Sequence, residues 1–128
     1  MNRICIIVAF FGLILFTIAG YAKPKTRESA ADSILTKLLL AVENNDRGSF
    51  IADGDESFKA GITRPLFDGV TAAFAPRMKK GYDVVFLGTL NQKGCLVVLK
   101  KLVFKDGGDD VLAKLILRDG KIAGFWFQ

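Results

Sequence analysis

Lys100 is the residue whose type and position most directly suggest chemistry. It stands in the run GCLVVLKKLVF, and its neighbours on the same side of the predicted strand are apolar. A buried lysine loses its charge or finds a partner, so Lys100 could bind an anionic or carbonyl ligand, with Trp126 as one wall of the pocket. Asp83 and Phe74 are the other residues predicted to border this pocket. The alternative is a lysine whose ammonium group reaches water along its aliphatic stem.

Catalysis has few candidate residues. Asp83 and Tyr82 could serve as base and proton donor in an isomerase or a dehydratase. The chain contains no histidine, which excludes every mechanism that needs an imidazole base. We therefore assign no catalytic residue.

The acidic runs and the cysteines do not form a metal site. Residues 53–56 and 106–110 are rich in aspartate, but the further ligand positions of a calcium loop are missing. We interpret residues 53–56 as solvated acidic residues of a loop and residues 106–110 as a glycine turn. Cysteine occurs only at Cys5 and Cys95, which excludes zinc sites built from several cysteines. We expect no metal ion and no cofactor.

The N-terminus has the pattern of an export signal. Arg3 precedes an uncharged apolar stretch, Ile4–Ala19, and small residues follow at Gly20 and Ala22. This pattern predicts a signal peptide over residues 1–22, cleaved after Ala22, in a periplasmic or secreted protein. An uncleaved anchor is the alternative, because the stretch approaches the roughly 20 residues that span a bilayer. After cleavage we expect no stable membrane span.

The elements that position these residues fall into two groups. After a short flexible linker over residues 23–27, apolar residues recur at helical spacing. The expected helices are Glu28–Asn44, Arg47–Phe58 with a break at Gly54, and a third between the N-cap Thr63 and Gly81.

From Tyr82 onward the apolar period changes from 3.6 to 2, which predicts strands. The expected strands are Tyr82–Leu90, Cys95–Lys105, Asp110–Arg118 and Lys121–Phe127. Residues 28–128 therefore form one α+β domain, with two to three N-terminal helices packed on one face of a curved four-stranded antiparallel meander.

The turn at Asp119-Gly120 predicts which residues share a face of the sheet. A two-residue turn pairs Arg118 with Lys121 and places Trp126 opposite Ala113. The helix-facing set is then Val85, Leu87, Leu96, Val98, Leu102, Phe104, Val111, Ala113, Leu115, Leu117, Ile122 and Trp126, together with the charged residues Lys100 and Asp83. A single bulge would exchange some of these assignments.

The opposite face combines basic and apolar side chains. Its interface candidates are Phe125, Phe127, Lys114 and Ile116. We expect this face to form a homodimer or to contact an anionic envelope surface. Nucleic acid is not an expected partner, because an exported protein seldom meets nucleic acid and the mature chain, without Arg3, would carry a net charge of only 5 − 1 = +4.

The order of helices and strands resembles the nuclear-transport-factor-2-like (cystatin-like α+β) superfamily, and within it a group of small exported bacterial domains of unknown function. The residues that carry the resemblance are Asp46 and Phe50, Phe58-Lys59, Phe86 and Gly88, and above all the run DGKIAGFWF from Asp119 to Phe127. The resemblance covers about Asp32 to Gln128. It implies a cone-shaped α+β domain and an exported compartment, and it implies no particular reaction.

Two functions follow from these observations. The first is an exported, non-catalytic binding or protein-interaction module, whose ligand would be a small apolar or anionic molecule. The alternative is a small-molecule enzyme of isomerase or lyase type that uses a pocket inside the cone. A roomy cavity with converging polar groups would favour a ligand or an enzyme, whereas a filled core would favour an interaction role.

Overall fold

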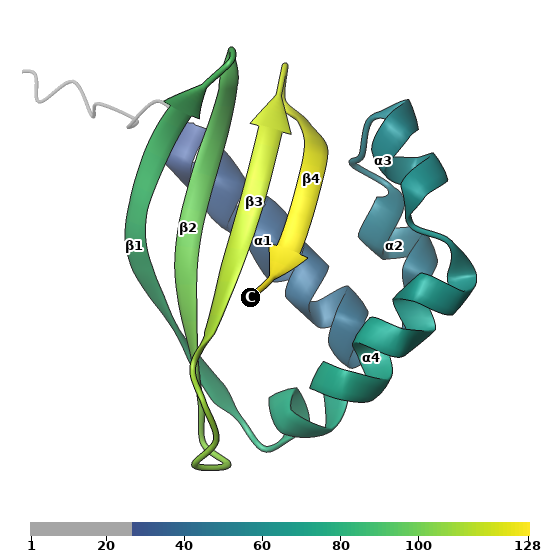
Figure 1. The fold of residues 1–128 in the computed structure, drawn as a ribbon, viewed down its shortest axis with the longest axis vertical. Helices are drawn as coiled ribbons and strands as arrows, with labels where there is room; N and C mark the ends of the chain where they lie inside the picture. The colour runs from purple at the N-terminus through teal and green to yellow at the C-terminus, as the bar shows by residue number, and fades with distance from the viewer. Residues whose placement is uncertain (1–26) are drawn as a thin grey trace, which may run out of the picture.

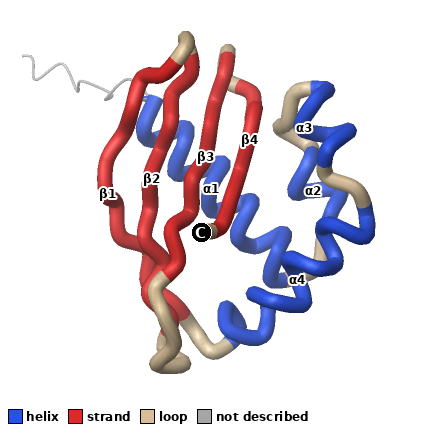
Figure 2. Tube along the Cα trace, viewed as in Figure 1, coloured by secondary structure: helices blue, strands red, loops and turns tan. Residues whose placement is uncertain are grey.

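The computed structural model describes residues 27–128, so the predicted signal peptide and residues 23–26 of the linker lie outside the described residues (Figure 1). Four helices precede one antiparallel sheet with the strand order β1-β2-β3-β4 (Figure 2). The elements are α1 (Arg27–Glu43), α2 (Arg47–Ile51), α3 (Glu56–Gly61), α4 (Arg64–Lys79), β1 (Tyr82–Gln92), β2 (Cys95–Phe104), β3 (Val111–Arg118) and β4 (Lys121–Phe127). The predicted α+β class and the four-stranded meander are confirmed.

The short helices begin where a side chain caps them. Asp46 accepts a hydrogen bond from the Ser49 N–H at the start of α2, and Asp55 accepts one from the Phe58 N–H at the start of α3. Thr63 caps α4, as predicted. The predicted break at Gly54 is also confirmed, because the second helical segment divides there into α2 and α3.

Two tight turns fix the hairpins. Lys93-Gly94 joins β1 to β2, and Asp119-Gly120 joins β3 to β4, with positive φ at both residues of each turn. This is the type I′ turn, whose twist matches that of the strands it connects. The longer connection from β2 to β3 is held from outside, because the Arg77 Nε atom of α4 lies 2.7 Å from Asp106 Oδ2.

The helices cover only one side of the sheet (Figure 1). Helix α1 crosses that face diagonally, and α2, α3 and α4 lie beside β4. The core fills the space between α1, α4 and the sheet; its most buried large side chains are Leu38, Val42, Phe67, Met78, Leu102, Leu115 and Ile122. We call the uncovered side of the sheet the outer face. It comprises Asp83, Val85, Gly88, Leu90, Gln92, Cys95, Val97, Leu99, Lys101, Val103, Leu112, Lys114, Ile116, Arg118, Lys121, Gly124 and Trp126.

Candidate functional site

The predicted position of Trp126 is wrong. In the structure it lies opposite Lys114 on the outer face, not opposite Ala113 under the helices, and its side chain is 48% exposed. Leu117 pairs with Ile122 as predicted, but Ile116 pairs with Gly124, so Ala123 is an extra residue in β4. Such a β-bulge reverses the direction of every side chain that follows it.

The same bulge turns two predicted interface residues into the interior. Phe125 contacts Phe50 of α2, with 5.8 Å between the ring centroids, and Phe127 contacts Phe74 of α4 at 4.4 Å. Phe125 and Phe127 therefore belong to the helix-facing aromatic cluster and not to the outer face. Phe74 is engaged in this packing and does not border a pocket with Lys100.

A second bulge, at Leu87 in β1, corrects the other predicted face assignments. The pairing shifts between Phe86 and Gly88. Before the bulge, Val84 lies opposite Leu102 on the helix side, and Asp83 lies opposite Val103 on the outer face. Asp83 is therefore separated from Lys100 by the thickness of the sheet, and Val85 likewise lies on the outer face. Tyr82 and Phe86 lie on the helix side, opposite Phe104 and Lys100.

Lys100 does lie on the helix side, as predicted, and it is nearly buried there. Its Nζ atom is 2.6 Å from Asp32 Oδ1 of α1 and 4.9 Å from the centroid of the Phe86 ring. These three residues and Val98 line a hollow of about 250 Å³ between α1 and the sheet. The Lys100 ammonium group is therefore paired. Sequence reasoning did not find Asp32, because only the path of α1 across the sheet brings it to this position.

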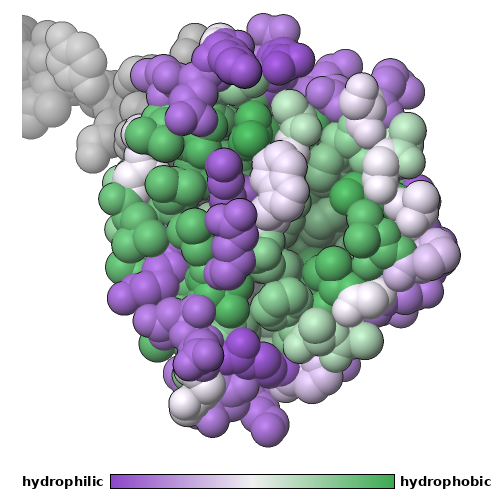
Figure 3. Space-filling model, viewed as in Figure 1, coloured by the Kyte–Doolittle hydropathy of each residue, from purple (hydrophilic) through white to green (hydrophobic). Residues whose placement is uncertain are grey.

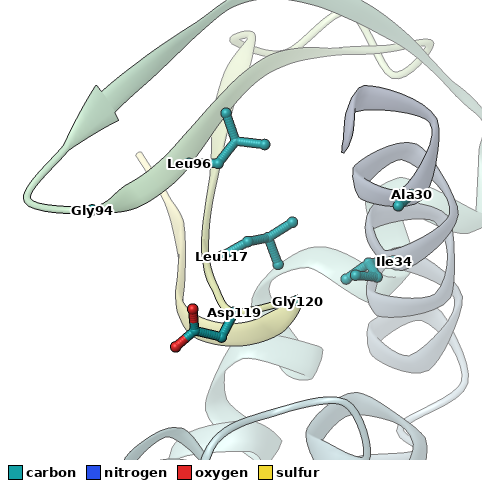
Figure 4. A pocket seen from close by; sticks show the side chains of 7 residues that line it. All are labelled: Ala30, Ile34, Gly94, Leu96, Leu117, Asp119 and Gly120. Atoms are coloured by element: carbon teal, nitrogen blue, oxygen red, sulfur yellow. The ribbon is translucent and has the colours of Figure 1, made fainter. Parts of the chain in front are cut away.

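A second hollow, of about 360 Å³, lies beside the first turns of α1 (Figure 4). Leu96 and Leu117 of the sheet and Ala30 and Ile34 of α1 form its walls, and Leu117 points toward Ile34. Asp119 is the one charged residue that lines it, and its carboxylate points away from α1. This hollow therefore offers apolar contact but no converging polar groups that would orient a substrate.

The outer face is a broad surface that combines apolar and basic side chains. Leu90, Leu99, Ile116 and Trp126 leave apolar surface exposed, and Lys101, Lys114 and Arg118 stand among them. Figure 3, which looks onto this face, shows a hydrophobic area crossed by hydrophilic side chains. The Nζ atom of Lys114 lies 5.8 Å from the centre of the Trp126 ring, which is within the range of a cation–π contact.

One end of the outer face contains a shallow hollow of about 580 Å³ between the two hairpin turns. Cys95, Val97 and Arg118 contribute to it. The Arg118 Nε–H donates to the Cys95 Sγ atom at 3.3 Å, and this hydrogen bond raises the pKa of the guanidinium. Arg118 therefore remains a fixed positive charge at this end of the face. The Cys95 thiol itself is buried.

Comparisons with known proteins do not assign a function to this chain. No protein-family model matches the sequence, and a search of the curated proteins finds no significant match. Within residues 27–128, none of the helices combines the length and the apolar character needed to cross a membrane. Function therefore has to be inferred from the surfaces and hollows described above.

Proposed function

We propose that this protein is an exported, non-catalytic binding module whose outer face binds an anionic membrane surface. The observation that carries the proposal is the composition of this face. It combines exposed apolar side chains, a tryptophan and four cationic residues on a sheet surface that no helix covers. Export is supported by Arg3 and the apolar stretch Ile4–Ala19. The resemblance to nuclear-transport-factor-2-like domains supports the same compartment and leaves the partner open.

Charge favours an anionic partner over a second copy at this face. Lys101, Lys114 and Arg118 extend across β2 and β3. The acidic side chains near them are Asp83 at one edge, Asp110, 3.9 Å from Lys101, and Asp55 and Asp119, which interact electrostatically with Arg118. Two copies packed face to face would bring two such positive surfaces together, and like charges in an interface are costly. Anionic lipid headgroups would neutralise them, while Trp126 and the aliphatic side chains enter the interfacial region.

The alternative of an isomerase or lyase has less support in the geometry. The residues predicted for its pocket lie in separate places: Lys100 is paired with Asp32, Asp83 and Trp126 lie on the outer face, and Phe74 packs in the core. No base and proton donor converge on a shared hollow among these residues. We therefore favour the binding role.

Vesicle binding tests this proposal. Vesicles of phosphatidylglycerol should co-sediment with the protein, vesicles of phosphatidylcholine should not, and binding should weaken as salt screens the charges. Because Trp126 is the only tryptophan, its fluorescence should shift to shorter wavelength on binding. Equal binding to both lipids, or none to either, would contradict the proposal.

Two charge-reversal variants locate the surface. Lys114→Glu should reduce binding at least tenfold, because it replaces a cation beside Trp126 by an anion. Lys79→Glu, which makes the same change of charge on α4, should reduce it far less. If both variants lose binding equally, only the net charge matters and the outer face is not the site.

A further inference from the structure

Strand β1 leaves more apolar surface exposed than any other element that the structure describes. Eight large hydrophobic side chains are exposed among the described residues, and five of them belong to β1: Val84, Val85, Phe86, Leu87 and Leu90, each between 41% and 53% exposed. Val84 and Phe86 point to the helix side, and Val85 points to the outer face. Both faces of this strand are therefore uncovered, because α1 passes over the middle of the sheet and does not shield β1 (Figure 1).

The backbone of β1 is also open along one edge. Within residues 27–128 the strand pairs with β2 alone, so the N–H and C=O groups along its other edge point away from the sheet. Natural edge strands are protected by lysine, by proline or by a bulge. Between Tyr82 and Gln92 there is no lysine, arginine or proline, and the bulge at Leu87 leaves the regular segment Tyr82–Phe86 available for pairing.

We infer that β1 pairs with the β1 strand of a second copy of this chain, in antiparallel orientation, to form one continuous eight-stranded sheet. The open backbone edge requires an extended strand as its partner, and the apolar side chains on both faces require a partner that is apolar on both faces. A second β1 strand meets both requirements. A two-fold axis at Val84 places Tyr82 opposite Phe86 and Asp83 opposite Val85, so the one charge of this segment does not face its own copy.

The other edge of the sheet is partly covered, which favours pairing through β1. At the free edge of β4, the Ile122 N–H donates to the Asp53 carbonyl and the Ile122 carbonyl accepts from the Asp55 N–H, each at 2.9 Å. The loop between α2 and α3 thus occupies the start of that edge. Among the described strands, β1 is open along its whole outer edge, whereas β4 is covered at Ile122. Two copies that pair through β1 form a closed dimer.

The oligomeric state of the full chain, expressed in a bacterial host that exports it, tests this inference. Light scattering after size exclusion, over a series of concentrations, should give twice the chain mass. Val84→Lys should give a folded monomer, because it places two like charges at the two-fold axis. Leu66→Lys is the matched control, since Leu66 on α4 is 51% exposed and Val84 is 43% exposed, and it should remain dimeric. A monomeric wild type at every concentration, or equal dissociation by both variants, would overturn the inference.

A cross-linking experiment covers the case in which Val84→Lys fails to fold. At the two-fold axis the residue at position 84 faces its own copy, so Val84→Cys should form an intermolecular disulfide on mild oxidation. Leu66→Cys should not. If the two variants cross-link equally, the pairing of β1 strands is wrong. Neither result depends on lipid, so failure here is distinguishable from failure of the proposed membrane binding.

Discussion

The indole ring of Trp126 lies over Gly124, two residues earlier on the same face of β4. A side chain at position 124 would overlap the ring atoms. The glycine therefore allows the ring to lie against the strand, where it forms a flat part of the outer face. This contact places the ring of Trp126, which pairs with Lys114 across β3 and β4.

Substituting Gly124 should move the tryptophan. In Gly124→Ala the new methyl group needs the space that the ring occupies, so the indole should turn into solvent and its emission should shift to longer wavelength. Gly88→Ala is the control, because it adds a methyl group to β1 where no atom lies within 4 Å. Unchanged emission in Gly124→Ala would show that the ring does not rest on Gly124.

Substitutions on the two faces of β4 should lower the stability of the protein by different amounts. Phe125→Ala should lower the free energy of unfolding by about 3 kcal/mol, because it removes a ring packed on Phe50 and leaves a cavity. Trp126→Ala should cost only about 1 kcal/mol, since the ring is half exposed. Urea unfolding followed by circular dichroism measures both values. The reverse order would return Trp126 to the core and contradict the bulge at Ala123.

Removing Asp32 and removing Lys100 from their ion pair should affect the stability of the protein differently. Asp32→Ala should destabilise the fold by about 1 kcal/mol, because it leaves a nearly buried ammonium group without its carboxylate. Lys100→Met should be neutral or stabilising, since it removes the charge and keeps the packing. In the Lys100→Met background, Asp32→Ala should then have no effect. If Asp32→Ala lowered the stability of Lys100→Met as much as it lowers that of the wild type, Asp32 would act through another contact.

Asp106 should make the stability of the protein sensitive to acid. The hydrogen bond from Arg77, and then the one from the Gly108 N–H, hold the pKa of Asp106 below its ordinary value of 3.8. The folded state therefore binds this proton less readily than the unfolded state. The contribution of Asp106 to stability is fully present above pH 3.8 and is lost as the pH falls further, through the depressed pKa of the folded state.

Urea unfolding of wild type and Asp106→Asn at a series of pH values checks this prediction. The stability difference between them should be constant at neutral pH and should shrink below pH 3.8. Asp110→Asn, in the same connection but 3.9 Å from Lys101, is the control and should show a smaller difference throughout. A pH-independent gap between wild type and Asp106→Asn would contradict the assignment.

The predicted signal peptide implies a mature protein that begins at Lys23. Cleavage after Ala22 is predicted by the small residues that follow the apolar stretch. The intact mass of the protein recovered from the exported fraction reports the new N-terminus directly. Recovery of a membrane-bound form that retains Met1 would favour the uncleaved anchor.

The local features of this fold could be predicted from sequence, because each depends on neighbouring residues. Thr63 caps α4, Gly54 divides a helical segment, and Asp119-Gly120 forms a tight turn, all as expected. The predicted face assignments were wrong where consecutive residues are all apolar, because the sequence pattern there does not distinguish one register from another. Phe125, Trp126 and Phe127 are all aromatic, so either register buries an aromatic side chain and the pattern cannot reveal the bulge.

The candidate site shows the same division. The burial of Lys100 followed from the alternation along β2, which no bulge interrupts. Its pairing with Asp32 depends on the path of α1 across the sheet, and that path is set by contacts between distant segments. The outer face was predicted as a mixed basic and apolar surface, but its central aromatic residue is Trp126 and not Phe125 or Phe127.

The bridge between Gly54 and Ile122 has a consequence for the order of folding. The three hairpin pairings of the sheet join neighbouring strands and close short loops, whereas this bridge joins the helical half of the chain to its last strand. Closing the longer loop costs more chain entropy, and long-range contacts slow folding. We therefore expect the meander to form in the transition state and the loop between α2 and α3 to dock onto β4 afterwards. Mutations in that loop should accelerate unfolding and leave the folding rate nearly unchanged.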